Sequence, residues 1–198
     1  MYNVMDLLTM FTDPETLHFG GVIDTIPANF SVLRQLSCLI ADCDNPYGRA
    51  FDISPHLGEC SRLQALTLRH LNESSGQLWP SISSSIARLT SLTALDILTW
   101  EVSGVTPTSS TFSSMLKVLE LDCGLVELPP AVMGLTSLER LRVLNNSEDV
   151  SYVPPTGPHL QNLTGLMLKA RPSDFTPDFL MAASALKMSA LFPPENNL

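Results

Sequence analysis

The sequence predicts an α/β solenoid in which each repeat adds one short strand to a shared parallel sheet. Leucine supplies 33 of the 198 residues, and the leucines recur in a six-residue phrase, Leu-x-x-Leu-x-Leu. Successive phrases begin 22 to 29 residues apart. Alternation along a strand points residues four and six of each phrase to the same side. One repeat cannot bury that apolar side alone, so stacked copies are expected to share a core.

The phrase occurs in six clear copies and two weaker ones. The clear copies begin at Leu36, Leu63, Leu92, Leu116, Leu138 and Leu163. The weaker copies begin at Pro14 and Leu186. Between strand phrases an apolar residue is followed by proline, as in Ile26-Pro27 and Leu128-Pro129. Because proline cannot donate to a sheet ladder, these segments are predicted to lie outside the sheet. Pairs such as Leu135 and Leu138 then return the chain to the core.

These phrases resemble the leucine-rich repeat (LRR) family, which has a period of 20–29 residues. The resemblance covers residues 14–198, with plant-type phrases such as Gly21…Ile26-Pro27 and intracellular-type phrases such as Leu125–Pro130. It implies a right-handed, horseshoe-shaped superhelix with a concave parallel sheet and an irregular or short-helical convex side. The family's asparagine at the ninth position of the repeat is found once, as Asn146, so irregular coils are expected.

The chain is predicted to form one domain with a short extension. Residues 1–13 form a short helix or tail, because Val4, Leu7 and Phe11 have helical spacing. Residues 14–198 form about seven to eight repeats. The last phrase is followed at once by Phe192-Pro193-Pro194, so the array is expected to be truncated at its C-terminus.

Charge and composition narrow the possible partners and compartments. A net charge of −9 argues against nucleic acid and anionic membranes, which require a basic face. No apolar run approaches the ~18 residues of a membrane helix, so membrane insertion is not expected. The first residues lack a basic leader and the four cysteines are scattered, which favours the cytoplasm. Four Asn-x-Ser/Thr sequons favour instead an extracellular receptor fragment, and an algal ciliary axoneme is a further alternative. The sequons lie at Asn29, Asn72, Asn145 and Asn162.

Catalytic and metal motifs are not found in the sequence, which has no phosphate-binding loop, nucleophile elbow or paired Cys-x-x-Cys. We therefore expect neither an enzyme nor a bound cofactor. The spacing of Cys38, Cys43, His56 and Cys60 is similar to that of zinc ligands. The repeat places the first two residues on the concave side and the last two on the following coil, so no metal site is predicted. Cys60 is expected to be a small packing residue.

Alternate strand positions, and the two residues after each strand, line the concave face of the family. Projection of that rule gives the candidate partner-binding residues His18, Asp42, Arg69, His70, Asp96, Trp100, Glu120, Asp122, Arg140, Arg142, Asn145 and Lys169. The carboxylates among them predict an acidic centre, and Arg140, Arg142 and Lys169 predict a basic flank. Trp100 is either an anchor for the partner or a plug for the turn that lacks asparagine. His18 and His70 are expected to be neighbours.

The resemblance implies a non-catalytic module that binds a protein partner on its concave face, as in scaffold and signalling proteins. A second hypothesis is that the chain is the recognition fragment of a larger receptor, immune NTPase or ubiquitin-ligase protein.

Overall fold

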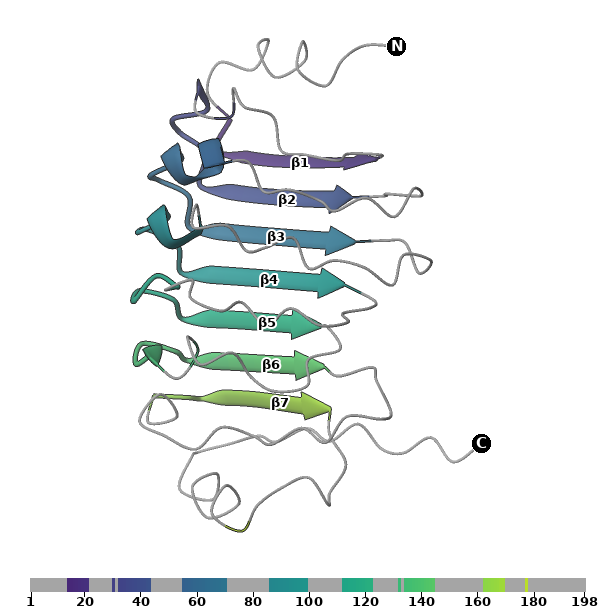
Figure 1. The fold of residues 1–198 in the computed structure, drawn as a ribbon, viewed down its shortest axis with the longest axis vertical. Helices are drawn as coiled ribbons and strands as arrows, with labels where there is room; N and C mark the ends of the chain where they lie inside the picture. The colour runs from purple at the N-terminus through teal and green to yellow at the C-terminus, as the bar shows by residue number, and fades with distance from the viewer. Residues whose placement is uncertain are drawn as a thin grey trace.

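In the part of the chain that the structure describes, seven strands form a single parallel sheet in the order of the sequence (Figure 1). The computed structural model describes residues 14–21, 30, 32–43, 55–70, 86–99, 112–122, 132, 134–144, 162–169 and 177. The strands are β1 (Thr16–Gly21), β2 (Cys38–Cys43), β3 (Ala65–His70), β4 (Ala94–Thr99), β5 (Val118–Asp122), β6 (Arg140–Leu144) and β7 (Gly165–Lys169). The predicted parallel β-solenoid is therefore confirmed. The expected segment 1–13 and the eighth phrase lie outside the described residues.

The register follows the repeat phrase without a slip. Leu39 is paired with Leu66, Leu66 with Leu95, and Leu95 with Leu119. Each strand begins at the third residue of its phrase rather than at the first. Differences in repeat length are therefore taken up between the strands, and the sheet keeps one register throughout.

The core lies on one side of the sheet and is built from the first, fourth and sixth positions of the phrase. The described sixth-position residues, Ala41, Leu68, Ile97, Leu121 and Val143, are at most 5% exposed. In the clear copies the fourth-position leucines are at most 6% exposed, and the first-position leucines at most 3%. The first-position leucine precedes the strand, and the chain makes a tight turn just before it. Leu36 N–H donates to the carbonyl of Leu33, and Leu33 N–H to that of Phe30, at 3.2 and 3.0 Å.

Other repeats build the same turn from buried apolar residues at intervals of three. Leu57, Cys60 and Leu63 form one such series, and Val132, Leu135 and Leu138 form another. Leu135, Leu138 and Cys60 are buried in the core, as the sequence predicts. A spacing of three residues is the period of a 3₁₀ helix. Two of these turns are accordingly 3₁₀ helices, η2 (Pro55–Glu59) and η3 (Ile86–Arg88).

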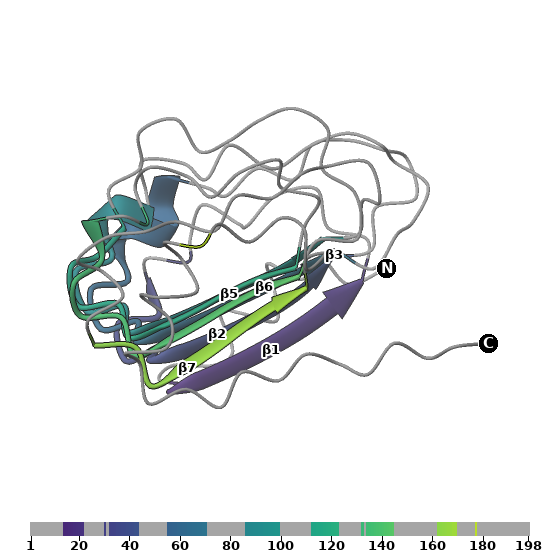
Figure 2. The same cartoon turned by 90° about the horizontal axis from the view of Figure 1, so that it is seen from below.

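The two 3₁₀ helices lie at the leading edge of the sheet, which we define as the edge where the strands begin (Figures 1 and 2). The predicted short-helical convex side is thus not confirmed. The Pro-containing segments between the strand phrases, on which that prediction depends, fall outside the described residues.

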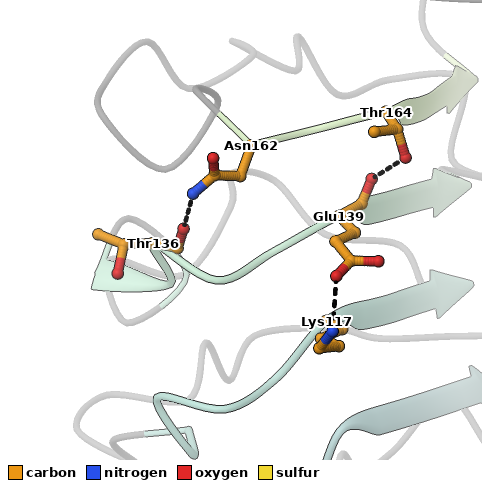
Figure 3. A network of polar contacts seen from close by, with 5 residues as sticks. All are labelled: Lys117, Thr136, Glu139, Asn162 and Thr164. Atoms are coloured by element: carbon orange, nitrogen blue, oxygen red, sulfur yellow. Dashed lines mark hydrogen bonds and ion pairs between the residues drawn. The ribbon is translucent and has the colours of Figure 1, made fainter.

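A ladder of hydrogen bonds joins successive repeats along the leading edge. The carbonyl of Glu139 accepts the N–H groups of Thr164 and Gly165 at 2.7 and 3.1 Å, and the Thr164 hydroxyl at 3.1 Å (Figure 3). Asn162 Nδ2 donates to the carbonyl of Thr136 at 2.7 Å. Lys117 Nζ lies 2.8 Å from Glu139 Oε1. These side-chain contacts add to the backbone hydrogen bonds that join one repeat to the next.

Candidate functional site

The face of the sheet opposite the core, which we call the outer face, carries the candidate site. Its first row, where the strands begin, holds Thr16, Cys38, Ala65, Ala94, Val118, Arg140 and Gly165 in register. Its middle row holds His18, Ile40, Thr67, Asp96, Glu120, Arg142 and Met167. The next row holds Gly20, Asp42, Arg69, Leu98, Asp122, Leu144 and Lys169. Neighbouring strands are about 4.8 Å apart, so side chains in one row can interact across strands.

Two ion-paired groups lie on either side of the centre of the outer face. On β1–β3, His18 Nε2 lies 2.5 Å from Asp42 Oδ2, and Arg69 Nη1 lies 3.7 Å from Asp42 Oδ1. On β5 and β6, Arg142 Nη1 donates to Glu120 Oε2 at 3.1 Å. The side chains in both groups remain partly accessible to solvent.

One arginine of the predicted basic flank lies instead in the acidic centre. Arg142 contacts Glu120 and belongs to the acidic centre, whereas Arg140 is exposed in the first row, beside Gly165. A Cβ atom at Gly165 would lie 3.4 Å from Arg140 Cγ, which shows how closely that arginine covers its neighbour.

Asp96 lies between the two ion-paired groups. Burial raises the pKa of its carboxyl from 3.8 to about 6, and the negative charges of Glu120 and Asp122 contribute to the increase. The positive charges of Arg69 and Arg142 oppose it only in part. Within the described part of the chain, Asp96 Oδ1 is buried and has no hydrogen-bond partner. Burial is the largest of these effects on the Asp96 carboxyl.

The raised pKa of Asp96 predicts a pH-dependent cost to stability. An acid whose pKa is higher in the folded state holds its proton more tightly there, so stability falls as pH rises from about 4 through about 6. The full shift corresponds to about 3 kcal/mol. Asp96 is only half-buried, and solvent screening reduces the effect to on the order of 1 kcal/mol. Asp96→Asn should therefore be more stable than the wild type at about pH 7.5 and equally stable at about pH 4, measured by urea unfolding. A difference that is the same at both pH values would contradict this origin.

The register corrects one expectation about the histidines. His18 is paired with Ile40, and Ile40 with Thr67, whereas His70 lies three residues beyond Thr67 on the same strand. The two histidines are thus separated by two strands and by three positions along the strand. They are not neighbours, and the group that His18 contacts is the Asp42 carboxylate.

Cys38 and Cys60, two of the residues with zinc-like spacing, lie on opposite sides of the sheet. Cys38 is half-buried in the first row of the outer face, and Cys60 is buried in the core. Burial, and to a smaller extent Glu59, raise the pKa of the Cys60 thiol to about 11. Cys60 therefore stays protonated and packs as a small apolar residue. No group of three or more His, Cys, Asp or Glu side chains suited to a metal ion is present among the described residues.

Four candidate residues are only partly placed or not placed. Trp100 and Asn145 lie outside the described residues. For His70 and Lys169 the structure describes the backbone within β3 and β7 and not the side chain. The remaining candidates all have backbone positions on the rows of the outer face.

Sequence reasoning missed a polar pocket at the leading edge. It has a volume of about 520 Å³ and is lined by Arg34, Gln35, Glu59, Ser61 and Arg62. Arg62 donates to the side-chain oxygen of Gln35. Gln35 and Arg62 each precede the first leucine of a phrase, so equal repeat position is the signal that could have paired them.

Comparison with solved structures finds the same kind of solenoid in a leucine-rich-repeat protein of Leptospira interrogans. The two chains superpose with a TM-score of 0.54 and 18% sequence identity, over 86% of this chain and 40% of that chain. This likeness shows that the chain has an LRR-like fold. No protein-family model and no curated protein match the sequence. Among the described residues, no helix has the length and apolar character needed to cross a membrane.

Proposed function

We propose that this chain is a non-catalytic protein-binding module that uses the outer face of its sheet. The observation that carries the proposal is the row of charged side chains at the centre of that face, which includes the half-buried Asp96. Six described residues form the binding surface of this proposal: Arg69, Asp96, Leu98, Glu120, Asp122 and Arg142.

The arrangement suits recognition because the sheet positions its side chains rigidly. Backbone pairing fixes the spacing between neighbouring charges, and the Arg142–Glu120 contact further restricts two of the side chains. A preorganised surface loses less conformational entropy when it binds. Alternating charges mainly determine partner choice and orientation, and add less to affinity.

Two further observations support a role in binding. LRR-like solenoids commonly serve in protein interaction, and the comparison structure has this fold. Cys38 and Cys60 are free thiols, which supports a cytoplasmic location for such a module.

Reversal of charge on the outer face should abolish partner binding. We expect the double variant Glu120→Lys, Asp122→Lys to lose the protein that the wild type retains in an affinity pull-down, because the new ammonium groups repel a complementary partner. The retained protein is identified by mass spectrometry, purified and titrated against both chains.

The matched control reverses two exposed carboxylates away from the outer face, Glu59→Lys with Glu139→Lys. It changes the net charge by the same amount and should retain the partner. Equal binding by the wild type and the outer-face variant, both folded by circular dichroism, would remove the outer face as the binding site.

A further inference from the structure

The polar pocket at the leading edge lies between two successive repeats and takes no part in the outer face. Arg34 and Gln35 line it from the turn before β2, and Glu59, Ser61 and Arg62 line it from the turn before β3. Its volume of about 520 Å³ lies within the range of small-molecule sites. All five lining residues are exposed, so their polar groups are accessible to a ligand.

The repeat brings two arginines to adjoining turns at this pocket. Arg34 and Arg62 each lie within the two residues that precede the first leucine of a phrase. In the other clear copies both of these positions hold uncharged residues. Gln35 and Arg62 occupy equal positions, as do Arg34 and Ser61, so these four side chains start from two neighbouring levels of the solenoid. The lining thus holds two cations and one carboxylate, on a chain whose net charge is −9.

The backbone that carries the lining residues is held by hydrogen bonds within and between the repeats. Arg34 N–H donates to the carbonyl of Val32, and Ser61 N–H donates to that of Glu59, both at 2.9 Å. The carbonyl of Ser61 accepts the hydroxyl of Ser91, in the next repeat, at 2.7 Å. The lining side chains therefore start from a fixed backbone, which reduces the entropy lost when a ligand binds.

The lining contains more hydrogen-bond donors than the protein itself uses. Arg62 donates to the side-chain oxygen of Gln35, which restrains its guanidinium group and leaves further N–H groups of that side chain available. The guanidinium group of Arg34 makes no hydrogen bond or ion pair with another described residue. The Ser61 hydroxyl and the Gln35 amide nitrogen are neutral donors. Together these groups form a donor set suited to an anion with several oxygens.

We propose that this pocket binds the phosphate group of a phosphate monoester, with Arg34 and Arg62 as its charged contacts. A phosphate monoester has three terminal oxygens and about two negative charges at neutral pH. It can therefore accept hydrogen bonds from both guanidinium groups and from the neutral donors at the same time. This site lies on a different surface from the proposed function and does not depend on it.

Other classes of ligand fit the lining less well. A carboxylate has two oxygens and one negative charge, so it leaves part of the donor set unused. A cation would be repelled by Arg34 and Arg62 and attracted only by Glu59. An apolar group would cover polar side chains without replacing the water that they bind. Glu59 also repels a phosphate, so its removal tests the charge argument directly.

The experiment titrates the purified full chain with phosphate ligands and follows its backbone and arginine side-chain N–H signals by nuclear magnetic resonance. The probes are inorganic phosphate, glycerol phosphate and a phosphoserine tripeptide. Acetate and the unphosphorylated tripeptide are the references. Tighter binding of glycerol phosphate supports the site with a small ester as its ligand, and tighter binding of the tripeptide supports it with a phosphorylated protein segment.

Five proteins are compared: the wild type, Arg34→Gln, Arg62→Gln, Glu59→Gln and Arg88→Gln. Arg88 provides the matched control, since it is exposed on η3 at the same edge of the sheet and does not line the pocket. Because every substituted side chain is exposed, the variants should fold as the wild type does, which circular dichroism checks.

We expect the phosphate ligands to shift the N–H signals of the pocket residues in a saturable way, and the references to shift them less. Arg34→Gln and Arg62→Gln should each bind phosphate about tenfold more weakly than the wild type, because each loses a charge-assisted hydrogen bond. Glu59→Gln should bind about two- to fivefold more tightly, and Arg88→Gln should bind as the wild type does. Affinity for the esters should rise with pH through about 6, as their second negative charge forms.

Three results would overturn the inference. Equal affinity of the wild type, Arg34→Gln and Arg62→Gln would remove the pocket as the site. Acetate that binds as tightly as phosphate would contradict the proposed ligand chemistry. Signals that shift throughout the chain without saturation would show only the screening of surface charge by salt.

Discussion

Phe30→Ala should lower the free energy of unfolding by about 3–5 kcal/mol, the range typical of a deleted buried phenylalanine. The Phe30 side chain is 0% exposed, and its ring meets that of Phe19 edge-on, with centroids 5.9 Å apart and planes at 66°. Phe19 is only partly buried on β1, so this contact attaches the first strand to the core. The alanine variant loses both the buried apolar surface and the ring contact.

Urea unfolding of three variants separates this effect from general sensitivity of the region. Phe30→Leu retains part of the volume and should cost less than Phe30→Ala. Val32→Ala removes a neighbouring side chain that is 52% exposed, and it should change stability by less than about 0.5 kcal/mol. Equal stability of Phe30→Ala and the wild type would show that Phe30 is not a core residue.

Leu119→Ala should cost about 2–5 kcal/mol, because it leaves a cavity beneath the interior strand β5. Leu119 is 0% exposed and is in register with Leu95 and Leu141 on the adjacent strands. In a solenoid each repeat contacts only its neighbours, so the damage should be concentrated in the repeats of β4, β5 and β6.

Urea unfolding measures the total cost of Leu119→Ala, and amide hydrogen exchange shows where it falls. Met115→Ala is the control, since Met115 precedes β5 and is 54% exposed. A wild-type unfolding curve for Leu119→Ala, or an even loss of protection from β1 to β7, would contradict a core made of nearest-neighbour contacts.

The repeat phrase predicts the strands and the core well because both depend on local periodicity. Leu66 and Leu95 lie at equal phrase positions, and equal positions pair in the sheet even where the repeats differ in length. The turn before each strand was only partly predicted. Its spacing of three residues, as in Val132, Leu135 and Leu138, is visible in the sequence but differs from the strand period.

The sequence predicts which charged residues lie on the outer face, but not which of them form ion pairs. Which arginine reaches a carboxylate depends on the direction of its side chain and on the adjacent strand. Arg142 pairs with Glu120, whereas Arg140, two residues earlier, lies in the exposed first row. The raised pKa of Asp96 combines burial with charges from three other strands, and no local window of sequence contains that information.

The histidine error has the same origin. The position of each histidine within its own repeat predicts that His18 and His70 both lie on the concave face, but it does not give the distance between them. Only the register shows that Asp42 is close to His18.

The most direct test of the shared core is a methyl–methyl nuclear Overhauser measurement on the wild-type protein. The structure predicts contacts from the Leu119 methyl groups to those of Leu95 and Leu141, and none to those of Leu39, which lies three strands away. The same nearest-neighbour pattern should repeat from Leu39 to Leu166. Strong contacts between leucines of distant repeats, or the absence of contacts between adjacent ones, would contradict the parallel solenoid and with it the outer face proposed for binding.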